Sequence, residues 1–81
     1  MLYITIASRH LNKNEIDSAE YYINKANDLV VAKKAPIEEK SNVLRTYGNL
    51  YIKKGEFKKA LEYLFKSLEI TKRMNFQKRD L

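Results

Sequence analysis

Four polar side chains recur at intervals of three or four residues in the middle of the chain: Asn42, Arg45, Asn49 and Lys53. In a helix this spacing places them on one face. An asparagine amide both donates to and accepts from a peptide backbone, while arginine and lysine attract carboxylates. The chemistry of such a face suits an extended peptide; the alternative is an ordinary solvated polar face.

The sequence offers little chemistry for catalysis. His10 is the only histidine, cysteine is absent, and neither a glycine-rich phosphate loop nor a cluster with metal-ligand spacing occurs. The acids Glu15, Asp17 and Glu20 lie near the expected start of a helix, where carboxylates complement the backbone dipole. We therefore expect a non-catalytic protein that needs no metal or other cofactor, in which His10 and the tyrosines pack between helices.

Charge narrows the classes of partner. The 81 residues suffice for one small domain, and a net charge of +6 permits an anionic partner without requiring one. Half of the basic residues come in pairs near expected helix ends, where cations complement the backbone dipole, so nucleic-acid binding is the less favoured interpretation. The pairs are Lys33–Lys34, Lys53–Lys54, Lys72–Arg73 and Lys78–Arg79.

Targeting signals are not evident. No apolar run reaches the length that spans a membrane, and residues 1–7 show neither the basic leader nor the cleavage site of a signal peptide. The lack of cysteine fits a reducing compartment. These features predict a cytoplasmic protein without a membrane partner.

The two halves of the chain resemble each other at an offset of 41 residues. Small and large apolar positions match along their length, and six positions are identical. The identical pairs are Thr5/Thr46, Lys13/Lys54, Glu15/Glu56, Ala19/Ala60, Tyr22/Tyr63 and Lys25/Lys66. We interpret the chain as one domain with a first repeat over about 1–34, a second over about 36–74, and the beginning of a third at 75–81.

Each repeat has the pattern of two helices joined by a tight turn. In the second repeat, Pro36 suits the first turn of a helix and Gly55 can adopt the left-handed conformation that ends one. Asn14 stands in the first repeat where Gly55 stands in the second, and asparagine tolerates that conformation next best. The expected helices span about 2–13, 15–33, 36–54 and 56–74. The last is expected to carry an apolar stripe of Phe57, Ala60, Leu61, Leu64 and Leu68.

Gly48 lies inside the third expected helix, where glycine costs about 1 kcal/mol relative to alanine. Its counterpart in the first repeat is the equally small Ala7. Both are expected to face small residues of the succeeding helices, Ala19 and Ala60. The pattern predicts that small side chains let paired helices approach closely at these two points.

The residues at these positions resemble the pattern of a tetratricopeptide repeat. The stretch KKGEFKKALEYLFKSLEI is similar to the turn and second helix of that family. The pattern residues of the second repeat are Leu44, Tyr47–Gly48, Tyr51, Ala60, Leu64 and Ser67. Those of the first repeat are Tyr3, Ile6–Ala7, His10, Ala19, Ile23 and Ala26.

The resemblance implies an all-α fold, a right-handed α-solenoid of two antiparallel helix hairpins with four helices. In this family the concave surface, lined mainly by the first helix of each hairpin, binds proteins or peptides. That surface would here carry Ser8, Asn12, Asn42, Arg45, Asn49, Ile52 and Lys53. The lysine–asparagine set with which some members clamp a C-terminal carboxylate is incomplete. Members with long helices occur in bacterial regulatory proteins, which makes that the expected context.

The period of 41 residues departs from the family's usual 34. The additional seven residues correspond to about two helical turns, so one extra turn in each helix keeps the packing faces aligned. HEAT and armadillo repeats have a similar period, but they usually lack the pattern of glycine, tyrosine and alanine found here.

Two hairpins leave apolar end faces without cover, because solenoids normally need three or more units. We therefore expect self-association, with exchange of helices between copies as one form, and we expect the chain to be part of a longer repeat protein. An oligomerisation module of a larger regulator is the alternative function. The residues of the two end faces are Phe65, Leu68 and Phe76, and Leu2, Ile4 and Ile6.

Overall fold

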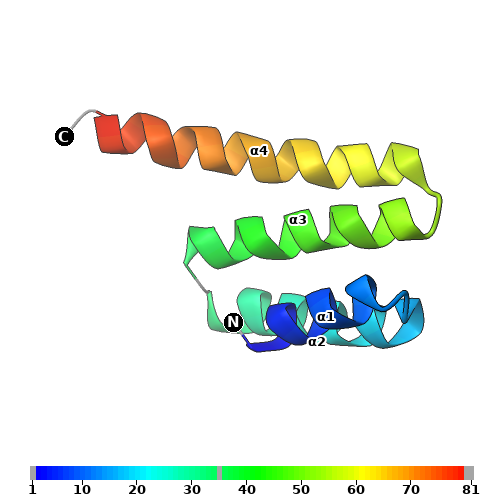
Figure 1. Cartoon of the computed structure of the whole chain (residues 1–81). Coiled ribbons are helices and arrows are strands. Elements are labelled where there is room, and N and C mark those ends of the chain that lie inside the picture. The colour runs from blue at the N-terminus through cyan, green and yellow to red at the C-terminus, as the bar shows by residue number, and fades with distance from the viewer. Residues whose placement is uncertain (1, 35, 80–81) are drawn as a thin grey trace.

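The protein is all-helical. The structure, a computed structural model, describes residues 2–34 and 36–79, with side chains only as far as residue 73 in the last helix. Its helices are α1 (Leu2–Asn12), α2 (Ile16–Lys33), α3 (Ile37–Lys53) and α4 (Phe57–Arg79), and none of the residues in those ranges forms a strand. The expected all-α class and the four helices are confirmed (Figure 1).

The turns within the two hairpins are built alike. Asn14 and Gly55 both have left-handed backbones, with φ of 60° and 79°. In each turn the N–H of the next residue donates to the carbonyl five residues earlier, at N···O distances of 2.8 and 2.9 Å. The prediction that Asn14 takes the place of Gly55 is therefore confirmed. Lys34, after α2, also has a left-handed backbone, with φ of 48°, which the residue type did not indicate.

Helix α3 lies at the centre of the structure. It packs against α4 on one side and against α1 and α2 on the other, while the described part of α4 contacts α3 alone (Figure 1). Ser41 meets Ser67, and Gly48 lies against Ala60. Because residue numbers rise along α3 as they fall along α4, the two helices are antiparallel.

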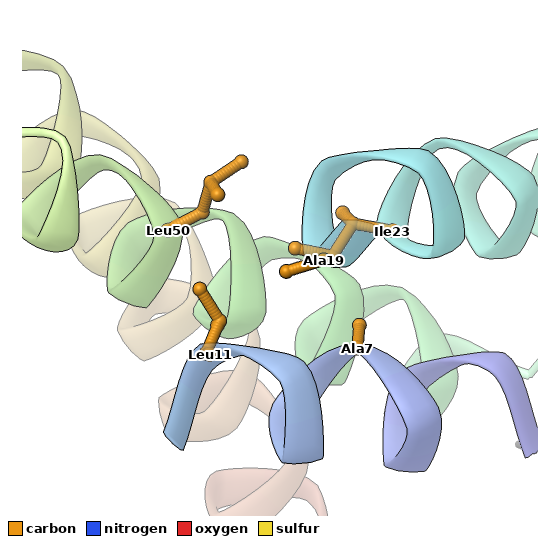
Figure 2. Close-up of a cluster of buried hydrophobic side chains, with 5 residues drawn as sticks. All are labelled: Ala7, Leu11, Ala19, Ile23 and Leu50. Atoms are coloured by element: carbon orange, nitrogen blue, oxygen red, sulfur yellow. The ribbon is translucent and has the colours of Figure 1, made fainter. Parts of the chain in front are cut away.

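The apolar core lies where α3 meets the first hairpin. Leu50 of α3 is fully buried among Ala7 and Leu11 of α1 and Ala19 and Ile23 of α2 (Figure 2). A second cluster joins α2 to α3 and comprises Ala26, Val30 and Val43. Leu50 therefore ties three helices together.

Between α3 and α4 the core is small and partly polar. The Ser41 and Ser67 hydroxyls lie 2.9 Å apart, and Ser67 also donates to the Ser41 carbonyl at 3.0 Å. Both serines are buried. Their mutual hydrogen bonds satisfy polar groups that would otherwise be costly to bury.

The predicted close approach at Gly48 is confirmed. A Cβ atom there would lie 2.6 Å from Leu64 Cδ2, 2.7 Å from Leu64 Cγ and 3.4 Å from the Ala60 carbonyl oxygen. In the first hairpin, Ala7 and Ala19 are fully buried in one cluster. Small residues therefore mark the tight contact in both hairpins.

The apolar stripe predicted for α4 is only partly correct. Ala60 is buried and Leu64 is half-buried against α3, but Phe57, Leu61 and Leu68 are exposed. The physical reason is that α3 contacts the side of α4 that carries Ala60, Leu64 and Ser67. The exposed apolar side chains lie on a neighbouring side, which no described helix covers.

Helix α4 extends to Arg79, past residue 74, near which the second repeat was expected to end. The beginning of a third repeat at 75–81 stays a prediction. Neither glycine nor proline, the two residues that most strongly end a helix, follows Gly55. Residues 80–81 and the side chain of Phe76 lie outside the described residues.

Substituting Gly48 tests the close approach. Gly48→Ala should lower the free energy of unfolding by about 0.5–2 kcal/mol, because overpacking against Leu64 outweighs the gain of about 1 kcal/mol in helix propensity. Urea denaturation followed by circular dichroism measures the change.

The matched background is Leu64→Ala, which removes the side chain that a methyl group at position 48 would meet. In that background Gly48→Ala should be neutral or stabilising by up to about 1 kcal/mol. A clear stabilisation by Gly48→Ala in the wild-type background would contradict the tight contact.

Candidate functional site

A shallow hollow lies between α1 and α3 and has a volume of about 160 Å³. Its lining residues are Ser8, Leu11 and Asn12 from α1 and Asn49, Ile52 and Lys53 from α3. All three α3 residues and Asn12 are exposed, whereas Leu11 is buried. The hollow therefore has polar walls open to solvent and an apolar floor.

The lining consists of three pairs of repeat-equivalent residues. At the 41-residue offset, Ser8 corresponds to Asn49, Leu11 to Ile52 and Asn12 to Lys53. Equivalent residues come together because α1 and α3 run in the same direction in register, each being the first helix of its hairpin. Leu50, buried against α1, holds this register.

Of the six polar residues predicted to bind a ligand, four come together in the hollow: Ser8, Asn12, Asn49 and Lys53. Ile52, which was also expected on the concave surface, lies with them. The remaining two, Asn42 and Arg45, do not line the hollow. The repeat equivalent of Arg45 is Ile4, which packs against the second core cluster, so α1 offers no polar partner at that level.

Asn42 and Arg45 instead contact each other. The Arg45 guanidinium donates to the Asn42 side-chain carbonyl at 3.1 Å, on the exposed surface of α3. Arg45 lies on the same face of α3 as Asn49, one turn earlier. Its remaining N–H donors would be available to a ligand that extends beyond the hollow.

Leu11 is the lining residue that the predicted set lacked. The repeat alignment contained the signal, because Leu11 pairs with Ile52, which was placed on the concave surface. Leu11 also belongs to the apolar core, since its side chain is almost fully buried. In the hollow its exposed edge adds an apolar contact between the polar pairs.

The chemistry of the hollow suits a peptide. Two asparagine amides and a serine hydroxyl can pair with backbone N–H and C=O groups, and Leu11 with Ile52 can contact an apolar side chain. Lys53 is the one charged group in the lining. It would attract a carboxylate at one end of a bound segment.

The opposite side of α3 carries a stack of tyrosines. The ring centroids of Tyr51 and Tyr63 lie 5.4 Å apart with nearly parallel planes, and Tyr47 lies 5.2 Å from Tyr63. The Tyr47 hydroxyl donates to Asn24 of α2 at 2.6 Å. These contacts join three helices, which supports the interpretation of the tyrosines as packing residues.

Lysines surround this stack, but they are engaged within the structure. Lys54 forms a 2.6 Å ion pair with Glu20, whose hydrogen bond raises the pKa of the ammonium. Lys54 and Lys59 also lie over the Tyr51 ring, at 5.5 and 5.6 Å from its centroid. The two members of the Lys53–Lys54 pair therefore point to different surfaces.

His10 lies against Tyr22 with a centroid distance of 5.5 Å and almost parallel rings. Its Nδ1 is 3.5 Å from a Glu15 carboxylate oxygen and makes no hydrogen bond to the described residues. This placement supports the packing role expected for His10. No group of three or more histidine, aspartate or glutamate side chains in the described part of the chain could hold a metal ion.

Comparison with protein-family models, curated proteins and solved structures finds no match to this chain. Among the described residues, no helix combines the length and apolar character that crossing a membrane requires.

Tyr47 makes stability depend on pH in the alkaline range. Burial, followed by the neighbouring Tyr63 and Tyr51, raises the pKa of Tyr47 from 10.0 to about 12. Below pH 10 the hydroxyl is protonated in both states and its contribution to stability is complete. Between pH 10 and 12 the unfolded chain releases this proton while the native state retains it, so stability falls as pH rises.

The free energy of unfolding of the wild-type protein should therefore fall more steeply from about pH 9.5 to 11.5 than that of Tyr47→Phe. Urea titrations at a series of pH values measure both slopes. Equal slopes would show that Tyr47 does not carry this dependence.

Proposed function

We propose that the chain is a non-catalytic binding scaffold of the tetratricopeptide type, in which the hollow between α1 and α3 holds an extended peptide or protein segment. The observation that carries this proposal is the lining, made of three repeat-equivalent pairs with polar walls and an apolar floor. In this proposal the four helices form two units of a right-handed α-solenoid, and the hollow is part of its concave surface.

The ligand that fits best is an extended segment with an apolar side chain and a nearby carboxylate. Asn49 and Asn12 would pair with its backbone, and Leu11 and Ile52 would contact the apolar side chain. Lys53 would bind the carboxylate. The resemblance to repeat proteins of bacterial regulators suggests a cytoplasmic regulatory protein as the setting.

Nucleic-acid binding has weaker support. A nucleic-acid surface needs cations that converge on one face, whereas Lys53 lines the hollow and Lys54 pairs with Glu20 on another side of α3. Lys33 is the last residue of α2, and Lys34 directly follows it. The cations are thus distributed over separate surfaces.

Peptide selection tests the proposal. Peptides from a random displayed library are selected on the immobilised protein, and their affinity is measured by fluorescence anisotropy. Asn49→Ala and Lys53→Ala should each weaken binding about tenfold, because each removes hydrogen bonds from the ligand, in the case of Lys53 to a charged group.

The matched control is Lys33→Ala, which removes the same charge from an exposed position outside the hollow. It should leave the affinity unchanged, and all three variants should keep the wild-type circular dichroism spectrum. If the selected peptides bind Asn49→Ala and Lys53→Ala as tightly as wild type, the hollow is not the binding site.

A further inference from the structure

One face of α4 exposes four large apolar side chains in a row, which we call the α4 stripe: Phe57, Leu61, Phe65 and Leu68. Their exposed fractions are 63%, 53%, 63% and 48%. They recur at intervals of three or four residues and so lie in a narrow band along the helix. Contiguous exposed apolar surface of this kind marks an interaction site more often than isolated apolar residues do.

The equivalent face of α2 is covered in this structure. At the 41-residue offset Leu61 corresponds to Glu20 and Phe65 to Asn24. Glu20 and Asn24 contact α3 through Lys54 and Tyr47, each at 2.6 Å. The face of α2 that receives α3 combines these polar contacts with the apolar residues Ala26 and Val30. No described helix covers the corresponding apolar face of α4 (Figure 1).

We propose that a second copy of this chain covers the α4 stripe, with the two α4 helices antiparallel about a two-fold axis. This interface is separate from the hollow and does not depend on the proposed peptide binding. A two-fold contact uses the same surface on both copies, and the stripe is complementary to itself in one register.

Charge fixes that register. Lys58 and Glu69 lie on the same flank of the α4 stripe, eleven residues apart and both exposed. When Leu61 lies opposite Phe65 of the other copy, Lys58 comes opposite Glu69 of that copy, and Phe57 lies near its Leu68. The two-fold axis repeats each contact, so two pairs of opposite charge flank one apolar seam.

In a head-to-tail arrangement, α1 of a second copy would dock on α4 as α3 docks on α2. The residues of α1 disfavour this arrangement. Arg9 would then take the place of Leu50, its repeat equivalent, and Leu50 is fully buried. A buried arginine without a partner is costly, so the closed two-fold pair is the favoured assembly.

Sedimentation velocity on the 81-residue chain gives the first test. We expect a reversible monomer–dimer equilibrium with a dissociation constant on the order of 10 μM, since one helix face buries no more than the roughly 800 Å² per partner of a standard interface. Phe65→Glu should weaken it about 100-fold or more, because it places a charge in the apolar seam. The exposed position of Phe65 leaves the monomer fold intact, which circular dichroism verifies.

A charge exchange tests the register. Lys58→Glu and Glu69→Lys should each weaken dimerisation about tenfold, because each replaces two attractive pairs with two repulsive ones. The double variant, which has the wild-type net charge, should restore the affinity. The matched control Lys66→Glu changes the net charge as Lys58→Glu does, but from outside the flank, and should have little effect.

Two results would overturn the proposal. A wild-type chain that remains monomeric at several hundred micromolar shows that the α4 stripe receives some other occupant, such as a further hairpin or a different protein. A dimer whose affinity falls with either single exchange and is not restored in the double variant shows that the copies do not meet in this antiparallel register.

Discussion

The close approach of α3 and α4 at Gly48 constrains the rest of the structure. With Leu64 packed where a Cβ atom at position 48 would lie, the lack of a side chain at Gly48 lets α4 pack on α3 through Leu64 and Ala60. The larger apolar residues Phe57 and Leu61 lie on a neighbouring face of α4, which α3 leaves exposed. The side of α4 that is used for the tight contact therefore determines which apolar residues remain exposed.

Packing buries some sides of helix α3 and leaves one side open for the candidate site. Gly48 faces α4, and Leu50 faces the first hairpin. On a third side of α3, Tyr47 contacts α2 through its hydrogen bond to Asn24. The direction that remains open carries Asn49 and Lys53, so the hollow occupies the part of α3 that packing leaves free.

The sequence predicts features that depend on one hairpin more reliably than features that depend on stacking. The turns and the tight contact at Gly48 follow from residue types within a repeat, and four hollow residues were expected from the resemblance to tetratricopeptide repeats. The burial of Leu50 does not, because it requires the first hairpin beside α3. Arg45 lies outside the hollow for a similar reason, since its equivalent in α1 is the core residue Ile4. The left-handed backbone of Lys34 has no residue-type signal at all.

The dimensions of the hollow connect the two proposals. From Ser8 to Asn12, α1 rises about 6 Å, whereas an extended peptide advances roughly 3.3 Å per residue. The lining would therefore contact only about two residues of a bound peptide directly, and two repeats alone would bind it weakly. Lys53, at one end, would give the bound segment a direction. A two-fold dimer through the α4 stripe would present two such hollows, and a partner with two copies of the motif would gain affinity from the second, intramolecular contact. In this way self-association through the α4 stripe would compensate for the small number of ligand residues that one hollow contacts.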